Sequence, residues 1–448
     1  MSGEAATLDR TPGDSIWGNR PFMLLWTAQA ISQTAQNSIW FALMVLIEEA
    51  THSTTQIGLA IVSFILPSVI FTVPAGVLVD RVDKRLMLVA TNWLRAVVVL
   101  GYLVFSGSVA AIYAVTFVFS IISQFFLPAE AAMIPALVRR ERLITANSLF
   151  NLTFTISQLV GIVFLAPILI KVFGTGSLFV VIAVLFAVCG VLVFPLPHGG
   201  RVHAEGVAEE EIQAVRRFFA DLRETWHFLV TDRVATIAMV VLTSGATLTL
   251  IVAMVAPRFV VTVLDITPDD TVFILAPAGL GMAVGALLIG RLTRRVSKEF
   301  LVVAGTGGVA LGMALLAAVD PLWSIVFPQV HALLGADLSV PRIVSQVSVV
   351  MVIAAVTGFA LSMMLIPSQT ILQEQAPVAS RGRIFAVQIM LGNLASLLPL
   401  VFVGGLADIV GVSWVLVLLA ISMAVLGIVA FRAYKSRIRG EPPVAGTA

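Results

Sequence analysis

The sequence predicts an all-α integral membrane protein whose twelve transmembrane helices form two pseudo-symmetric six-helix bundles. Hydrophobic residues make up 59% of the 448 residues and charged residues only 12%, whereas soluble domains average about 45–50% and about 25%. Apolar stretches of roughly 20 residues, enough for one helical crossing of a bilayer, recur along the whole chain. Similar loop sequences also follow the second and the eighth stretch, which indicates an internal repeat.

Twelve apolar stretches have the length and composition of membrane-spanning helices. We place them at residues 21–47, 56–79, 86–105, 109–134, 147–171, 177–195, 234–257, 271–290, 300–319, 344–371, 384–409 and 413–432. These spans divide the chain into five parts. The parts are a cytoplasmic tail at 1–20, a six-helix bundle at 21–195, a linker at 196–233, a second six-helix bundle at 234–434 and a cytoplasmic tail at 435–448.

The distribution of basic residues predicts the orientation of the chain. Most of the 27 lysines and arginines fall in tails and loops on the face shared by the two termini, and only Lys171, Arg258 and Arg342 fall on the opposite face. Because cytoplasmic loops carry an excess of basic residues, we expect both termini in the cytoplasm and the chain in the plasma (inner) membrane. In the linker, apolar residues recur every three or four positions from Ile212 to Leu229, which predicts an amphipathic helix along the membrane surface.

Composition and motifs argue against several other classes of protein. The net charge of +2 argues against nucleic acid as a partner, and the single cysteine, Cys189, excludes an internal disulfide. The sequence lacks the phosphate-binding and zinc-binding motifs of common enzymes, so we expect no enzymatic activity, no cofactor and no metal site. The expected partners are a small-molecule substrate and the lipid bilayer, with protons as a candidate coupling ion, and the expected state is a monomer.

Two of the predicted cytoplasmic loops carry the same arrangement of basic residues. The loop after the second span reads Gly-x-x-x-Asp-Arg-x-x-Lys-Arg and is formed by Gly76, Asp80, Arg81, Lys84 and Arg85. The loop after the eighth span repeats the basic positions with Arg291, Arg294 and Arg295. Gly76 permits close packing of two helices, and Asp80 can cap a helix N-terminus or pair with a basic side chain of the other bundle. We therefore predict a gating role for these residues.

The pattern from Gly76 to Arg85 resembles the loop motif of the major facilitator superfamily. The segment from Phe125 to Val138 resembles a bacterial branch that includes macrolide-type drug exporters and the enterobactin exporter, and Asn92 with Arg95 is similar to an Asp-x-x-Arg motif of that branch. The resemblance implies transport by alternating access, in which the two bundles rock around a central cavity, and it implies export. The sequence departs from well-studied proton-coupled exporters because no acidic residue lies between Pro21 and Ile47.

In the fold that this resemblance implies, the first, fourth, seventh and tenth spans line the central cavity. A stripe of amide and aromatic side chains follows one face of the first span, where lipid would leave the amides without partners. With polar and thioether side chains of the other three spans, it predicts a pocket for amphiphilic, weakly charged or neutral substrates. Packing and hydrogen bonds between helices are the alternative explanation. The candidate residues are Trp26, Gln29, Gln33, Gln36, Asn37, Trp40, Ser120, Gln124, Thr243, Thr247, Met363 and Met364.

Three ionisable residues, Arg95, Glu130 and Asp408, lie within or near the predicted spans. Because charge inside a membrane is costly, such residues are candidates for function. They either carry a coupled proton or form structural ion pairs. We accordingly predict a secondary active transporter that exports amphiphilic small molecules, with proton antiport as the candidate coupling. An importer or facilitator of one metabolite on the same fold is the first alternative, and a membrane receptor without transport activity is the second.

Overall fold

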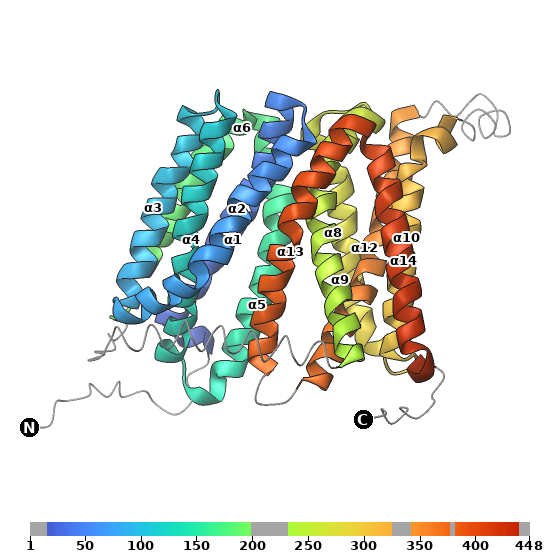
Figure 1. Cartoon of the computed structure of the whole chain (residues 1–448). Helices are drawn as coiled ribbons and strands as arrows, with labels where there is room; N and C mark the ends of the chain where they lie inside the picture. Colours follow the sequence, from blue (N-terminus) through green and yellow to red (C-terminus); the bar gives the residue numbers. More distant parts are fainter. Residues whose placement is uncertain (1–15, 199–231, 325–341, 377–380, 439–448) are drawn as a thin grey trace, which may run out of the picture.

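The computed structural model of the chain (Figure 1) describes residues 16–198, 232–324, 342–376 and 381–438. Within these residues every regular element is a helix, as the sequence predicts. The predicted amphipathic helix of the linker lies outside the described residues.

The helices follow one another as an up-and-down series in each half of the chain (Figure 1). The elements of the first half are η1 (Ile16–Gly18), α1 (Arg20–Thr51), α2 (Thr54–Arg81), α3 (Lys84–Val104), α4 (Val109–Leu137), η2 (Arg140–Arg142), α5 (Leu143–Leu159), the π-helical η3 (Val160–Leu165) and α6 (Ala166–Val193). Those of the second half are α8 (Arg233–Val263), η4 (Pro268–Thr271), α9 (Val272–Leu292), α10 (Lys298–Ala317), α12 (Arg342–Gln375), α13 (Arg381–Val410) and α14 (Val412–Ile438).

These elements account for all twelve predicted crossings. Among the described residues, 11 helical stretches are long and apolar enough to cross a membrane, and one of them, Thr145–Val193, has 49 residues. That length is about twice what one crossing needs. The backbone of Gly174 in this stretch is non-helical, with φ 81° and ψ 162°, and divides it into two crossings. A break at one glycine, which tolerates positive φ, therefore replaces the loop expected between residues 171 and 177.

Six of the described helices begin directly after a short polar residue that caps them. The N–H groups of a first helical turn have no acceptor within the helix, and in each case the preceding side chain accepts from at least one of them. These residues are Asn19 before α1, Ser53 before α2, Asp83 before α3, Ser108 before α4, Asp232 before α8 and Ser297 before α10.

The helices run between two ends of the bundle, which we name by the path of the chain. The terminal end is the end at which α1 begins and α14 ends, and the distal end is the end at which α1 ends and α2 begins (Figure 1). The terminal end is the face that the sequence assigns to the cytoplasm. As the chain alternates, α2 begins at the distal end, whereas α13 ends there.

The largest helix interfaces lie within each half of the chain. In the first half, α1 and α3 pack on α6, and α2 packs on α4, whereas in the second half α12 packs on α9 and α10, and α10 packs on α14. The two halves meet mainly where α2 packs against α13, with smaller contacts of α8 with α1 and α2. We call this surface the seam.

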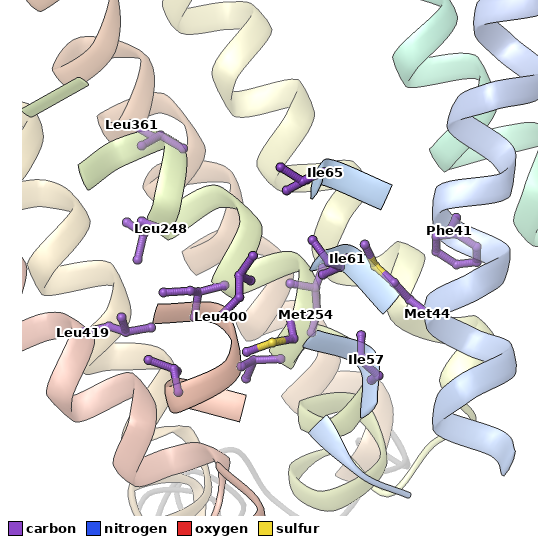
Figure 2. Packing of buried hydrophobic residues seen from close by; sticks show 14 of the residues in the cluster. Phe41, Met44, Ile57, Ile61, Ile65, Leu248, Met254, Leu361, Leu400 and Leu419 are labelled. Carbon is purple, nitrogen blue, oxygen red and sulfur yellow. The ribbon is translucent and has the colours of Figure 1, made fainter. Parts of the chain in front are cut away.

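Among the described residues, the apolar core crosses the seam in the distal part of the first half. Figure 2 shows Ile57 and Ile61 of α2 beside Met44 of α1 on one side and Met254 of α8 on the other. A Cβ atom on Gly58 would lie 2.9 Å from the sulfur of Met254 and 3.0 Å from the carbonyl oxygen of Leu400 in α13. The absence of a side chain at Gly58 thus lets α2 approach both helices of the second half.

A second apolar cluster fills the terminal part of the first half. It extends from Phe22 and Leu25 of α1 to Phe126 of α4 and Phe150 of α5, and among the described residues it has no member from the second half. The halves are therefore packed together at the distal end, and no shared core joins them at the terminal end within the described residues.

Candidate functional site

The amide and aromatic stripe of α1 faces the interior of the first half. Gln29 and Gln33 are buried, whereas Trp26, Asn37 and Trp40 are partly buried, as is Gln36. The indole N–H of Trp26 donates to Thr153 of α5 at 2.8 Å, and the ring of Trp40 packs on Phe64 of α2 with centroids 4.6 Å apart. The side-chain oxygen of Gln29 is buried without a hydrogen-bond partner. Part of the stripe thus contacts neighbouring helices.

The predicted residues of α4 also bind to a neighbouring helix. Ser120 is buried, and its hydroxyl donates to the carbonyl oxygen of Phe64 in α2 at 2.5 Å. The Gln124 side-chain oxygen accepts from the Thr72 hydroxyl of α2 at 3.3 Å, while its amide donates to the carbonyl of Ser120 at 3.3 Å. Both side chains connect α4 to α2, and Gln124 remains partly exposed.

The candidates of the second half divide into packed and partly exposed residues. Met364 is fully buried, with its terminal methyl 3.1 Å from the position of a Cβ on Gly245 of α8. The structure therefore places Met364 in the core between α12 and α8, and the prediction that it lines a cavity is wrong for this conformation. Thr243 and Met363 are partly exposed, and the hydroxyl of Thr247 lies 2.9 Å from that of Ser396 in α13.

Arg95 and Glu130 are both buried in the first half but do not form the expected ion pair. The guanidinium group of Arg95 donates to the side-chain oxygen of Asn92 at 2.9 Å and lies between the rings of Phe126 and Phe186, 4.2 Å and 4.7 Å from their centroids. Among the described residues, no salt bridge joins Arg95 to Glu130, although the two groups are close enough for a Coulombic interaction. One guanidinium nitrogen and one carboxyl oxygen are therefore buried without partners.

At the distal end, Asp408 of α13 binds the first turn of α2. One carboxylate oxygen accepts from the backbone N–H of Thr54 at 2.7 Å. The other accepts from the Ser53 hydroxyl at 2.7 Å, the Thr55 N–H at 3.0 Å and the Thr55 hydroxyl at 2.5 Å. Asp408 thus caps a helix of the other half, which differs from the ion pair considered from the sequence.

Two salt bridges also connect the halves at the distal end, and sequence reasoning missed both. Glu48 at the end of α1 is fully buried and lies 3.0 Å from Arg258 of α8. Lys171 of α6 lies 2.7 Å from Asp270 of η4. A signal was present in the sequence, because Lys171 and Arg258 are two of the three basic residues assigned to the face opposite the termini. A basic residue on a mainly acidic face is a candidate for pairing.

At the terminal end, the glycine of each repeated loop lies beside open space. A Cβ atom on Gly76 would have no neighbour within 4 Å, and the same holds for Gly290 at the equivalent position of the second half. Gly76 therefore does not lie at the close helix contact expected from the sequence. Asp80 is exposed, as are Arg291, Arg294 and Arg295.

The acid that caps a helix in this loop is Asp83 rather than Asp80. One oxygen of Asp83 accepts from the N–H groups of Arg85 and Leu86 at the start of α3, at 2.9 Å and 3.3 Å. The other lies 2.6 Å from the ring nitrogen Nδ1 of His198. The position of Asp83 directly before a helix was the available signal. Within the same loop, the Lys84 ammonium donates to the carbonyl of Asp80 at 2.9 Å.

We expect the substitution Asp83→Ala to destabilise the protein at neutral pH and less in acid. Burial by itself raises the pKa of the Asp83 carboxyl. Hydrogen bonds from His198 and from the N–H groups of Leu86 and Arg85 together lower the pKa by more than burial raises it, so the pKa lies below its ordinary value. The contribution of such a group is present at neutral pH and is lost as the pH falls through its pKa. Thermal unfolding in detergent should show a loss of about 1 kcal/mol at pH 7.

The matched variant for this prediction is Asp83→Asn, because asparagine is also a good helix cap and should retain most of the stability. An equal loss of stability for Asp83→Ala at pH 7 and at about pH 2, below the lowered pKa of the carboxyl group, would contradict the assigned role of the carboxylate.

The sequence matches one known family over most of its length. Residues 25–341 match the profile of the Major Facilitator Superfamily. The chain belongs to this superfamily. The resemblance noted at the repeated loop is thereby confirmed.

Superfamily relatives of this chain include drug exporters. It is 23% identical to the multidrug efflux pump Tap of Mycolicibacterium fortuitum, over 92% of this chain and 95% of that protein. It is 24% identical to macrolide efflux protein A of Streptococcus pyogenes, over 71% of this chain and 78% of that protein. It is also 28% identical to the uncharacterized MFS-type transporter YkuC of Bacillus subtilis, although this match spans only 33% of the chain and 35% of YkuC.

Solved structures confirm the superfamily fold. The crystal structure of the nucleoside transporter NupG matches with a TM-score of 0.71 at 13% identity, covering 93% of this chain and 99% of NupG. A bacterial homologue of the human lysosomal transporter Spinster matches with a TM-score of 0.69 at 14% identity, covering 97% of this chain and 100% of that one. At these identities the likeness concerns the fold of the superfamily alone.

Proposed function

We propose that this superfamily transporter exports amphiphilic small molecules from the cytoplasm by alternating access between its two bundles. The observation that carries the proposal is the uneven contact between the halves. Asp408, Glu48 with Arg258, and Lys171 with Asp270 join the halves at the distal end, whereas the space beside Gly76 at the terminal end is open. A carrier that alternates between two states is expected to close one end at a time.

The orientation follows from the positive-inside rule, which assigns the basic terminal end to the cytoplasm. The described state is then closed to the outside. The repeated loops would close the cytoplasmic side in the opposite state, where Gly76 and Gly290 would permit close helix contact. This proposal keeps the gating role of Asp80, Arg81, Lys84 and Arg85, and of Arg291, Arg294 and Arg295, for the state in which the terminal end is closed.

Export of amphiphilic compounds is supported by the nature of the relatives and of the candidate pocket. Tap and macrolide efflux protein A are named as efflux proteins. The partly buried side chains of α1, Gln36 and Trp40 among them, combine amide and aromatic surface. Such surfaces bind apolar molecules with a few polar groups and permit breadth of substrate.

The test is export from a drug-sensitive bacterial host that expresses the chain. We expect lower accumulation of a macrolide such as erythromycin than in host cells with an empty vector, and we expect a proton uncoupler to remove the difference. Purified protein in liposomes should show saturable flux and counterflow. Higher accumulation would instead support an importer, and an absence of flux and counterflow across a panel of amphiphilic compounds would support the receptor alternative.

A further inference from the structure

The distal end of the seam contains an interaction that the proposed gating loops do not include. Asp408 lies at the last turn of α13, three residues before Gly411, whose φ of 87° ends the helix. Its carboxylate accepts four hydrogen bonds from Ser53, Thr54 and Thr55, which begin α2 in the other half. The partners are more than 350 residues apart in the sequence, as the separation of 355 between Ser53 and Asp408 shows.

The first turn of α2 needs an acceptor from outside its own helix. The Ser53 side chain serves as the local cap and accepts from the N–H of Gln56. The N–H groups of Thr54 and Thr55 instead donate to Asp408. Two effects stabilise a carboxylate at this position. Charge-assisted hydrogen bonds are strong, and the N-terminus of a helix carries partial positive charge.

The backbone of α13 permits this approach at Gly404, one turn before Asp408. A Cβ atom on Gly404 would lie 3.0 Å from the Cα of Thr55 and 3.2 Å from the carbonyl oxygen of Thr54. Most side chains at this position would therefore push α13 away from α2. One turn further into α2, Ile57 is fully buried in the apolar cluster that also contains Met254 of α8, and Figure 2 shows both side chains.

We propose that Asp408 is a positioning residue that holds the distal end closed by capping α2 across the seam, and that its release accompanies opening of that end. The proposal rests on the alternating-access function proposed above. Rocking of the two halves separates α2 from α13 at the distal end, so the four hydrogen bonds form only in the distal-closed state. Asp408 therefore sets the balance between the two states and does not contact the transported molecule.

Asp408→Asn is the most informative substitution, because asparagine has nearly the same shape as aspartate but carries an NH₂ donor in place of one acceptor oxygen. Each carboxylate oxygen accepts from a backbone N–H, of Thr54 on one side and of Thr55 on the other. In either orientation, the amide NH₂ of asparagine therefore places a donor against a backbone donor. The matched control is Asp320→Asn, which makes the same change at an exposed acid just beyond α10 at the distal end.

The test measures the accessibility of a cysteine introduced at Ile57, in a chain whose single native Cys189 is replaced by alanine. Intact cells are treated from outside with a membrane-impermeant thiol reagent. We expect slow labelling of Ile57→Cys alone, similar labelling with Asp320→Asn, and labelling at least about ten-fold faster with Asp408→Asn. Asp408→Glu, which retains the carboxylate, should restore slow labelling in part.

A second reporter separates gating from loss of structure. A cysteine at Gly76, where the terminal end is open, is labelled in inside-out vesicles, and Asp408→Asn should slow this reaction as the other end opens. Unchanged labelling at Ile57, or faster labelling at both positions, would overturn the proposal. Neither cysteine reporter requires a substrate, so the two proposals can fail separately. If the export assay fails but Asp408→Asn still speeds labelling at Ile57→Cys and slows it at Gly76→Cys, export is refuted and the role of Asp408 stands.

Discussion

Glu130→Gln is expected to abolish transport driven by a pH gradient while leaving folded protein in the membrane. Glu130 lies in α4 with 2% of its surface exposed, and one carboxyl oxygen has no hydrogen-bond partner. That oxygen is satisfied either by a proton on the carboxyl group or by a movement of the nearby Arg95. Glutamine has the same shape but cannot exchange a proton, so it should retain substrate binding and lose coupling.

The measurement uses purified protein in liposomes with an imposed pH gradient and a transported compound from the export screen. Flux driven by the gradient should fall at least about a hundred-fold, whereas counterflow without a gradient should persist. The matched control is Glu141→Gln, an exposed acid in η2 beyond the end of α4, and it should behave as the native protein. Unchanged pH-driven flux in Glu130→Gln would leave Glu130 with a structural role only.

Arg95 gives this prediction a physical basis that the sequence could not provide. The sequence placed Arg95 and Glu130 in the membrane, where a direct ion pair was one of two expectations. In the structure Asn92 and two aromatic rings hold the guanidinium group, so the carboxyl group is near the positive charge but not bonded to it. A weakly held acid can change its protonation state without breaking a salt bridge, and the orphaned atoms of both groups show that neither is fully satisfied.

The transmembrane helices were predictable because a bilayer imposes a length and a composition on every crossing. A difference among the described residues concerns α6, where the single non-helical residue Gly174 replaces the expected loop. Helix starts were also readable, since Ser53, Asp83 and Asp232 directly precede their helices. Asp83 shows the limit of motif reading, because the loop pattern drew attention to Asp80, which is exposed, and away from the acid that caps α3.

The contacts across the seam were not predictable, because they depend on the state of the transporter as well as on the sequence. Asp408 and Thr54 meet only when the distal end is closed, and no local pattern connects residues that are 354 positions apart. The loop around Gly76 shows the reverse case. Its pattern was evident in the sequence, but the described state leaves Gly76 without a neighbour. Sequence patterns thus predict gating residues for one end, whereas the structure shows contacts between the halves at the other.

Glycine packing is a further feature that hydropathy does not reveal, and it carries the largest expected effect on stability. The backbones of α9 and α12 approach so closely that a Cβ atom on Gly281 would lie 1.9 Å from the carbonyl oxygen of Ala355. The contact is mutual, since a Cβ atom on Gly358 of α12 would lie 2.0 Å from the carbonyl oxygen of Ala278 in α9. Backbone atoms cannot move aside as a flexible side chain can, so even one methyl group must separate the helices.

Gly281→Ala is therefore expected to lower the free energy of unfolding by at least about 2 kcal/mol or to prevent accumulation of folded protein. Gly290→Ala is the matched control, because it makes the same change in the same helix where no atom lies within 4 Å of the new Cβ. This control should be neutral or gain up to about 1 kcal/mol from the higher helix propensity of alanine. Thermal unfolding in detergent, together with the yield of monodisperse protein, measures both. Equal melting temperatures for the two variants would show that α9 and α12 can separate at little cost, which would contradict the tight interface described for this half.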